Sequence, residues 1–215
     1  MKASSLSLLL SIIVLGCVTA PASADTIAIT NASFEITNPL NISCGAGCAY
    51  NTGPIPGWTT TGGQQGSWMP NSTYFSSPVP DGSIVAYSNL GGTISQTLAD
   101  SLVANTSYVL SVDIGHRLDG WVTDYTIALY AGSTLLDSLS GSNGVIPAGT
   151  FATESFTFDS GTTPASGNLG IKLTSAGSQT DFDNVRLTAS PVPEPGSLAL
   201  LAAGLGLTIL VLRRR

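Results

Sequence analysis

The chain has 215 residues, a formal net charge of −6 and only 9% charged residues, while 43% of its residues are hydrophobic. This length allows one or two domains, but both ends have the composition of export or membrane segments, which leaves one soluble domain. Residues 25–190 hold three basic against twelve acidic residues, a formal charge of −9. Such a surface repels phosphate, so it excludes a nucleic-acid-binding module and favours divalent cations and neutral hydroxylated partners.

The N-terminus predicts export. Lys2 precedes an apolar run from Leu6 to Val18, and the small residues Ala22-Ser23-Ala24 follow. This order of charge, apolar core and small residues is typical of a secretory signal peptide, here residues 1–24, with cleavage after Ala24. Val14-Leu15-Gly16-Cys17 resembles the lipoprotein box of bacteria, so lipidation of Cys17 stays open as an alternative.

Two cysteines remain after removal of the signal peptide, and they lie close together in Cys44-Gly45-Ala46-Gly47-Cys48. An exported chain meets an oxidising compartment, so a disulfide between Cys44 and Cys48 is expected. The glycines make such a short loop feasible. A zinc site is disfavoured because the single histidine, His116, lies far away in the sequence.

The C-terminal residues 191–215 form a separate unit in three parts. Val192-Pro193-Glu194-Pro195 predicts a stiff extended spacer, because proline fixes φ and lacks a backbone donor. Ser197 to Leu212 is a stretch of 16 uncharged residues, which predicts one transmembrane helix. Arg213-Arg214-Arg215 then marks the cytoplasmic side.

The ordered combination of Val192-Pro193-Glu194-Pro195, apolar helix and terminal arginines resembles the PEP-CTERM sorting signal. The resemblance implies cleavage near this motif by an exosortase-type protease in a Gram-negative bacterium that makes extracellular polysaccharide. The protein would then be anchored transiently in the inner membrane before it reaches the outer surface or the matrix. A permanent C-terminal anchor is the alternative. The same tail is also described as an ice-binding protein C-terminal domain, a name that says nothing about the domain before it.

The segment between the ends lacks a long apolar pattern of helical period and shows short alternating runs separated by Gly, Asn, Asp or Pro. This pattern predicts an all-β domain over residues 25–190. Ala131-Gly132 predicts a hairpin turn, and residues 38–82 show little regular structure. The expected strands are 26–30, 83–87, 93–98, 107–114, 123–130, 133–139, 150–158, 168–174 and 182–188.

Alternation within these strands predicts two packed sheets. Tyr125, Ile127 and Leu129 share one face of their strand, whereas Lys172 and Thr174 lie opposite the apolar residues of theirs. One buried face and one solvated face in each strand is typical of a β-sandwich.

Five segments together resemble the galactose-binding-like jelly roll, a β-sandwich shared by many carbohydrate-binding modules. In this fold a structural calcium often lies where the first strand meets the last, and Glu35 and Asp183 match those positions. Pairing of both acids with Arg186 or with backbone donors is the alternative. The segments are Asn31-Ala32-Ser33-Phe34-Glu35, Ile55-Pro56-Gly57-Trp58, Ile94-Ser95-Gln96-Thr97-Leu98, Tyr108-Val109-Leu110-Ser111-Val112-Asp113 and Asp181-Phe182-Asp183-Asn184-Val185-Arg186-Leu187.

A ligand site is expected where aromatic rings and polar groups gather on loops. Residues 113–124 concentrate the only histidine, one arginine, three acids and an indole in a chain with few charges. An ion pair of Arg117 with Asp113 or Asp124 that braces a turn is the alternative for this segment, and Trp58 is assigned to the core. The predicted ligand-binding residues are Trp68, Tyr74, His116, Arg117, Asp119 and Trp121.

Catalysis is not expected from this sequence. No serine lies in a nucleophile-elbow sequence, and no pair of carboxylates is singled out for glycoside hydrolysis. The sequence therefore predicts a secreted, non-catalytic protein of the cell surface or the exopolysaccharide matrix that binds glycan. A purely structural component of the biofilm matrix is the alternative, and a hydrolase or an ice-binding protein are minor ones.

Overall fold

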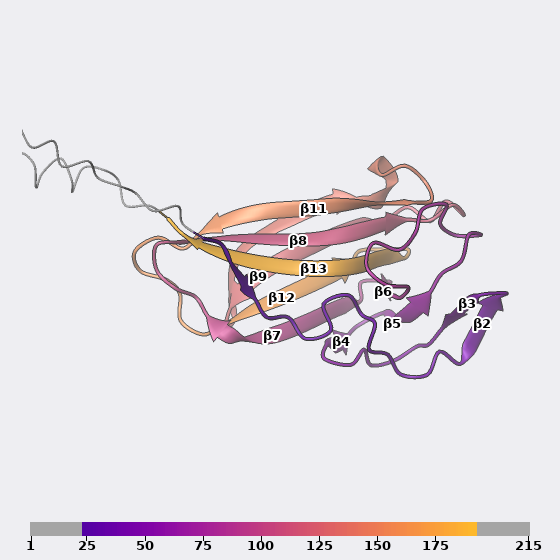
Figure 1. The fold of residues 1–215 in the computed structure, drawn as a ribbon, viewed down its shortest axis with the longest axis horizontal. Coiled ribbons are helices and arrows are strands. Elements are labelled where there is room, and N and C mark those ends of the chain that lie inside the picture. Colours follow the sequence, from indigo (N-terminus) through magenta and orange to yellow (C-terminus); the bar gives the residue numbers. More distant parts are fainter. Residues whose placement is uncertain (1–22, 193–215) are drawn as a thin grey trace, which may run out of the picture. The chain divides into compact units, whose positions relative to one another are not determined.

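The computed structural model describes residues 23–192 (Figure 1). The predicted signal peptide up to Ala22 and the sorting tail from Pro193, with its predicted transmembrane helix, lie outside the described residues. Within residues 23–192 no helix has the length and apolarity needed to cross a membrane. The helical structure described there is one 3-10 turn, η1 (Asn143–Val145).

Two antiparallel sheets make up the domain, which confirms the predicted all-β sandwich. The eight-stranded sheet has the order β11-β8-β13-β6-β5-β3-β2, and β1 pairs with β13. Figure 1 shows β8, β11 and β13 as long neighbouring strands. The strands of this sheet are β1 (Asp25–Ile27), β2 (Ile42–Gly45), β3 (Cys48–Tyr50), β5 (Gln64–Met69), β6 (Val85–Asn89), β8 (Thr106–His116), β11 (Thr150–Asp159) and β13 (Thr180–Pro191).

The five-stranded sheet packs against it with the order β10-β9-β12-β7-β4. Its strands β9 and β10 form the hairpin that Ala131-Gly132 predicts, with Gly132 at φ +56° in the turn. Tyr125, Ile127 and Leu129 are buried between the sheets, as the alternation predicts. The strands are β4 (Thr59–Thr61), β7 (Thr93–Ser101), β9 (Asp124–Ala131), β10 (Thr134–Ser142) and β12 (Asn168–Ser175).

Residues 38–82 contain four strands, so the expectation of little regular structure there is wrong. Strands β2, β3 and β5 extend the eight-stranded sheet beyond β6, and β4 pairs with the edge of β7. These strands have three to six residues, and polar or glycine positions interrupt them, as in Gln64-Gln65-Gly66. Their alternation is therefore too short to read, and pairing with distant strands determines them instead.

The eight-stranded sheet carries a second apolar cluster on the face that points away from the sandwich core. At β6, Ala86 and the preceding Ile84 pack into the main core, whereas Val85 and Tyr87 join Cys48, Trp68 and Phe75 in the second cluster. This outer cluster is the floor on which a pocket is built.

Strand β8 has a glycine under the outer cluster for a steric reason. A Cβ at Gly115 would lie 2.7 Å from the ring of Phe151 and 3.0 Å from that of Phe75. These two rings stack with their centroids 4.4 Å apart, so only glycine allows them to lie flat on β8.

Candidate active site

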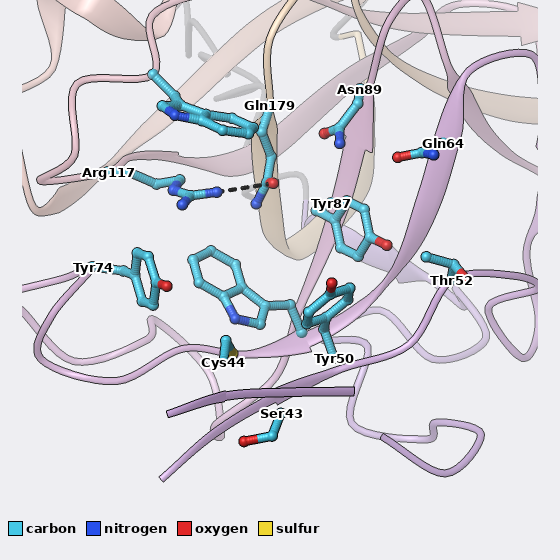
Figure 2. A pocket seen from close by; sticks show the side chains of 12 residues that line it. Ser43, Cys44, Tyr50, Thr52, Gln64, Tyr74, Tyr87, Asn89, Arg117 and Gln179 are labelled. Carbon is cyan, nitrogen blue, oxygen red and sulfur yellow. Dashed lines mark hydrogen bonds between the residues drawn. The ribbon is translucent and has the colours of Figure 1, made fainter. Parts of the chain in front are cut away.

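A pocket of about 470 Å³ opens over the outer face of the eight-stranded sheet. Figure 2 shows side chains from β2, β3, β5 and β6 facing residues of the loops that precede β13 and follow β8. One part of the wall is aromatic and another is polar, with Thr52, Gln64 and Asn89. The lining residues are Ser43, Cys44, Tyr50, Thr52, Gln64, Trp68, Tyr74, Tyr87, Asn89, Arg117, Trp121 and Gln179.

Arg117 occupies the aromatic part of the pocket. Its guanidinium carbon lies 4.5 Å from the ring centroid of Trp121, 4.8 Å from that of Tyr74 and 4.9 Å from that of Trp68. Asp119 accepts two hydrogen bonds from the same guanidinium, and the bond from Nε is 2.9 Å long. The cation is thus held by three aromatic rings and by one carboxylate.

A chain of hydrogen bonds leads from Arg117 to a buried acid. Nη1 of Arg117 donates to Oε1 of Gln179 at 2.9 Å (Figure 2), and Nε2 of Gln179 donates to Oδ1 of Asp181 at 2.6 Å. The other carboxyl oxygen of Asp181 is buried without a hydrogen-bond partner among the described residues. Asp181 therefore lies directly behind Gln179, one layer below the pocket surface.

Burial raises the pKa of Asp181 from its usual 3.8 to about 7, and the nearby Asp119 adds to this, although Gln179 and Arg117 act in the opposite direction. Desolvation dominates because a carboxylate in an apolar site loses its hydration. A carboxyl group with this pKa can give up and take back a proton near neutral pH. Asp181 is thus a candidate general acid.

Tyr87 is the cross-strand neighbour of Asp181 and stays a neutral phenol. Burial raises its pKa to about 12, with further contributions from Tyr50 and Asp181. Its hydroxyl donates to the backbone carbonyl of Asn51 at 2.8 Å. Tyr87 therefore supplies a fixed ring to the pocket rather than a second titrating group.

The predicted disulfide between Cys44 and Cys48 is present and forms part of the pocket wall. It closes the β2–β3 hairpin, and Cys44 lines the pocket. Sγ of Cys48 accepts a hydrogen bond of 3.3 Å from Nε1 of Trp68. The disulfide thus positions the indole that supports Arg117.

Removing this disulfide by Cys44→Ser together with Cys48→Ser is expected to lower the free energy of unfolding by about 2 kcal/mol, as loop-closure entropy predicts for a short loop. The same change should alter the fluorescence of Trp68, since its indole loses a fixed partner. Denaturant unfolding and emission spectra with and without reductant measure both effects. The wild type in reductant should have the same unfolding free energy and emission spectrum as the double variant, and reductant should change neither quantity in the double variant.

The structure brings together four of the six residues predicted to bind a ligand. Trp68, Tyr74, Arg117 and Trp121 line the pocket, and Asp119 anchors Arg117 from outside the lining. Their role in binding stays a prediction. The alternative pairing of Arg117 with Asp113 or Asp124 is wrong, since Asp119 is its carboxylate partner.

His116 does not reach the pocket. Its neighbour Gly115 faces the outer cluster, so alternation along β8 directs His116 to the opposite face of the sheet. There its Nδ1 lies 2.6 Å from the backbone oxygen of Ile146. Four further residues of the site are not predicted from the sequence, namely Tyr50, Tyr87, Gln179 and Asp181. Of these, Asp181 begins the segment 181–187 that resembles the jelly roll.

The two acids predicted to bind calcium face one loop. Oδ2 of Asp183 accepts from the backbone N–H of Asp81 at 2.9 Å, and Oε1 of Glu35 accepts from Ser83 and Ile84 at 2.8 and 2.7 Å. These bonds match the alternative in which backbone donors pair with both acids. No group of three or more His, Cys, Asp or Glu with the geometry of a metal site occurs within residues 23–192. Oxygen ligands suit calcium, so its binding here stays a prediction.

Comparison with known proteins identifies the family of the domain. Residues 25–188 match the HpiC1-like family, described as HpiC1 cyclase, and residues 191–215 match the PEP-CTERM protein-sorting motif. The second match confirms the predicted sorting signal, which marks the protein for export and for sorting to the cell surface by an exosortase. A search of curated proteins finds no match to the chain.

Three crystal structures of cyclases share the fold. A cyclase from Fischerella sp. in its apo form is 28% identical with a TM-score of 0.65, covering 80% of this chain and 98% of that one. A cyclase from Fischerella sp. TAU in complex with 4-(1H-indol-3-yl)butan-2-one is 31% identical with a TM-score of 0.65, covering 79% and 99%. The Stig cyclase Fisc from Fischerella sp. TAU, in complex with (3Z)-3-(1-methyl-2-pyrrolidinylidene)-3H-indole, is 31% identical with a TM-score of 0.63, covering 80% and 100%.

These matches overturn two predictions. The expectation of a non-catalytic protein that binds glycan is wrong, and so is the expectation that the domain is not an enzyme. A jelly roll hosts both carbohydrate-binding modules and cyclases, so resemblance to the fold led to the wrong class of function. The chain belongs to the HpiC1-like cyclase family.

Proposed function

We propose that this domain is an exported cyclase whose substrate carries an indole or a similar flat ring, and that the pocket over the eight-stranded sheet is its active site. The observation that carries the proposal is the buried carboxyl of Asp181 directly below an aromatic pocket. One of its oxygens accepts a hydrogen bond from Gln179, and the other has no partner among the described residues. The two indole compounds bound to the Fischerella sp. TAU cyclases support the choice of substrate class. Aromatic walls such as those of Tyr50 and Trp68 suit a flat ring.

The proposed reaction is a ring closure that neither adds nor removes atoms. The side chain of Gln179 first moves away from the carboxyl of Asp181, so that the carboxyl can reach the substrate. Asp181 then donates its proton to a basic atom of the substrate, and the protonated substrate becomes electrophilic. An electron-rich ring carbon then forms the new bond. The carbon loses its proton to the Asp181 carboxylate, which restores both the neutral product and the acid. Burial of the Asp181 carboxyl favours each step, because the low local dielectric constant strengthens the pairing between the substrate cation and the carboxylate.

We further propose that the PEP-CTERM tail decides where this reaction occurs. Its apolar segment would hold the protein transiently in the inner membrane of a Gram-negative bacterium until an exosortase releases the domain. The cyclase would then act at the outer surface or in the extracellular matrix. Its substrate must therefore be available outside the cytoplasm, or be exported as well.

The pocket is tested by a matched pair of tyrosine variants. Tyr50→Ala removes a half-buried ring of the pocket, whereas Tyr130→Ala removes a half-buried ring on the five-stranded sheet that packs against Lys172. Tyr50→Ala is expected to weaken binding of 4-(1H-indol-3-yl)butan-2-one by about tenfold, the loss of one aromatic contact. Calorimetric titration measures the dissociation constants. Equal affinities of the two variants, or no binding by the wild type, would refute this pocket as the substrate site.

A further inference from the structure

Arg117 is the only charged residue among the twelve that line the pocket. Its guanidinium lies within 5 Å of three ring centroids, those of Trp68, Tyr74 and Trp121. Three rings in this arrangement resemble the aromatic cages that bind ammonium ligands. Here the protein's own cation fills the cage, so no room is left between these rings for a ligand cation.

The guanidinium is fixed in this place from two directions. Nε donates to Asp119 and Nη1 donates to Gln179, each at 2.9 Å, and only 10% of the Arg117 side chain is exposed. Asp119 does not line the pocket, and 34% of its side chain is exposed. Solvent therefore screens the carboxylate more than the guanidinium, and a ligand in the pocket meets a net positive wall.

The size of this effect follows from Coulomb's law. A second positive charge about 5 Å from the guanidinium, at an effective dielectric constant of about 20, would bind on the order of 100-fold more weakly than a neutral ligand of the same shape. Partial compensation by Asp119 leaves an expected penalty of at least about tenfold. A neutral indole meets no such penalty, because it carries no charge that the guanidinium would repel.

We infer that Arg117 is a specificity-determining residue, which makes the pocket accept neutral electron-rich rings and reject cationic ligands. This inference rests on the proposed function, because it concerns the same substrate site. It is consistent with proton transfer inside the pocket. A neutral substrate gains positive charge only when Asp181 gives up its proton, so the new cation forms beside a new carboxylate.

Two ligands with the same carbon skeleton test the inference. They are 4-(1H-indol-3-yl)butan-2-one, which is neutral, and 4-(1H-indol-3-yl)butan-2-amine, which is protonated at neutral pH. Calorimetric titration of the wild-type protein should show at least a tenfold preference for the ketone. Arg117→Met, which keeps the side-chain bulk without the charge, should reduce this preference at least tenfold. Arg117→Lys keeps the charge and should retain the preference.

The outcomes separate the inference from the proposed function. Equal affinity of the wild type for both ligands would overturn the inference and leave the substrate site in place. Binding of neither ligand would overturn both. If circular dichroism shows that Arg117→Met does not fold, the variant Asp119→Asn tests the same inference independently. It keeps the guanidinium and removes its carboxylate, so the preference for the ketone must grow, and an unchanged or smaller preference would overturn the inference.

Discussion

Asp181→Asn is expected to slow cyclisation by at least about 100-fold, the usual contribution of a positioned general acid. Asparagine has nearly the same shape, and its oxygen can still accept the hydrogen bond from Gln179, but it has no proton to donate. Binding of a neutral indole ligand should change little, because Asp181 lies below the pocket surface. Chromatography with mass detection measures the rate at which a substrate converts to an isomer of the same mass.

Asp183→Asn is the matched control for this experiment. Asp183 follows two residues later on the same face of β13, and burial also raises its pKa to about 7. Its carboxylate holds the backbone of Asp81 instead of facing the pocket. The rate of the Asp183→Asn variant should therefore stay within a few-fold of wild type.

In the wild type the rate should fall as the pH rises through about 7, since the acid form of Asp181 is consumed. A full rate in the Asp181→Asn variant would rule out this acid.

The sandwich was predictable because its long strands have a recognisable pattern of alternating residues in their own sequence. In β9 the residues Tyr125, Ile127 and Leu129 recur at every second position, which predicts one buried face, and the structure buries all three. Strands β2 to β5 lack such a signal. Three residues such as Thr59-Thr60-Thr61 form a strand because β7 offers an edge, and no local pattern encodes that partner.

The candidate site was predictable only where its residues are conspicuous. Trp68 and Arg117 stand out as a large ring and a rare charge. Folding brings the guanidinium carbon to 4.9 Å from the ring centroid, although the two residues are 49 positions apart in the sequence. Asp181 alternates with apolar residues in β13 and therefore resembles a solvated outer residue. It is buried because Gln179, Arg117 and the aromatic side chains of the outer cluster lie over this face, a long-range arrangement that alternation along one strand does not reveal.

The pH dependence of folding provides the second large effect, and it also comes from Asp181. Its pKa is about 7 in the folded protein and 3.8 in the usual solvated state, so the folded state binds more protons between these values. The contribution of this group to stability is therefore full below about pH 4 and is lost as the pH rises through 7. The difference between a pKa of 3.8 and one of about 7 corresponds to roughly 4 kcal/mol of unfolding free energy as an upper limit. Asp183 also makes the folded state less stable as the pH rises, because burial raises its pKa as well.

Asp181→Asn should make the curves of stability against pH cross. The variant cannot ionise, so at pH 8.5 it avoids the charge that the wild type must bury, and it should be more stable by about 1–3 kcal/mol. At pH 4.5 the wild type is neutral at this position and leaves one O–H without an acceptor, whereas the buried amide of asparagine leaves two N–H groups without one. The additional unpaired donor should make the variant less stable by about 1–3 kcal/mol. Urea unfolding at both pH values measures the two differences. If the wild type were more stable at pH 8.5 as well, Asp181 would already be ionised without penalty and could not serve as the acid. A crossing would mean that folding keeps the Asp181 carboxyl protonated beneath the pocket. The wild type would then lose stability at high pH in exchange for an acid that can take part in catalysis.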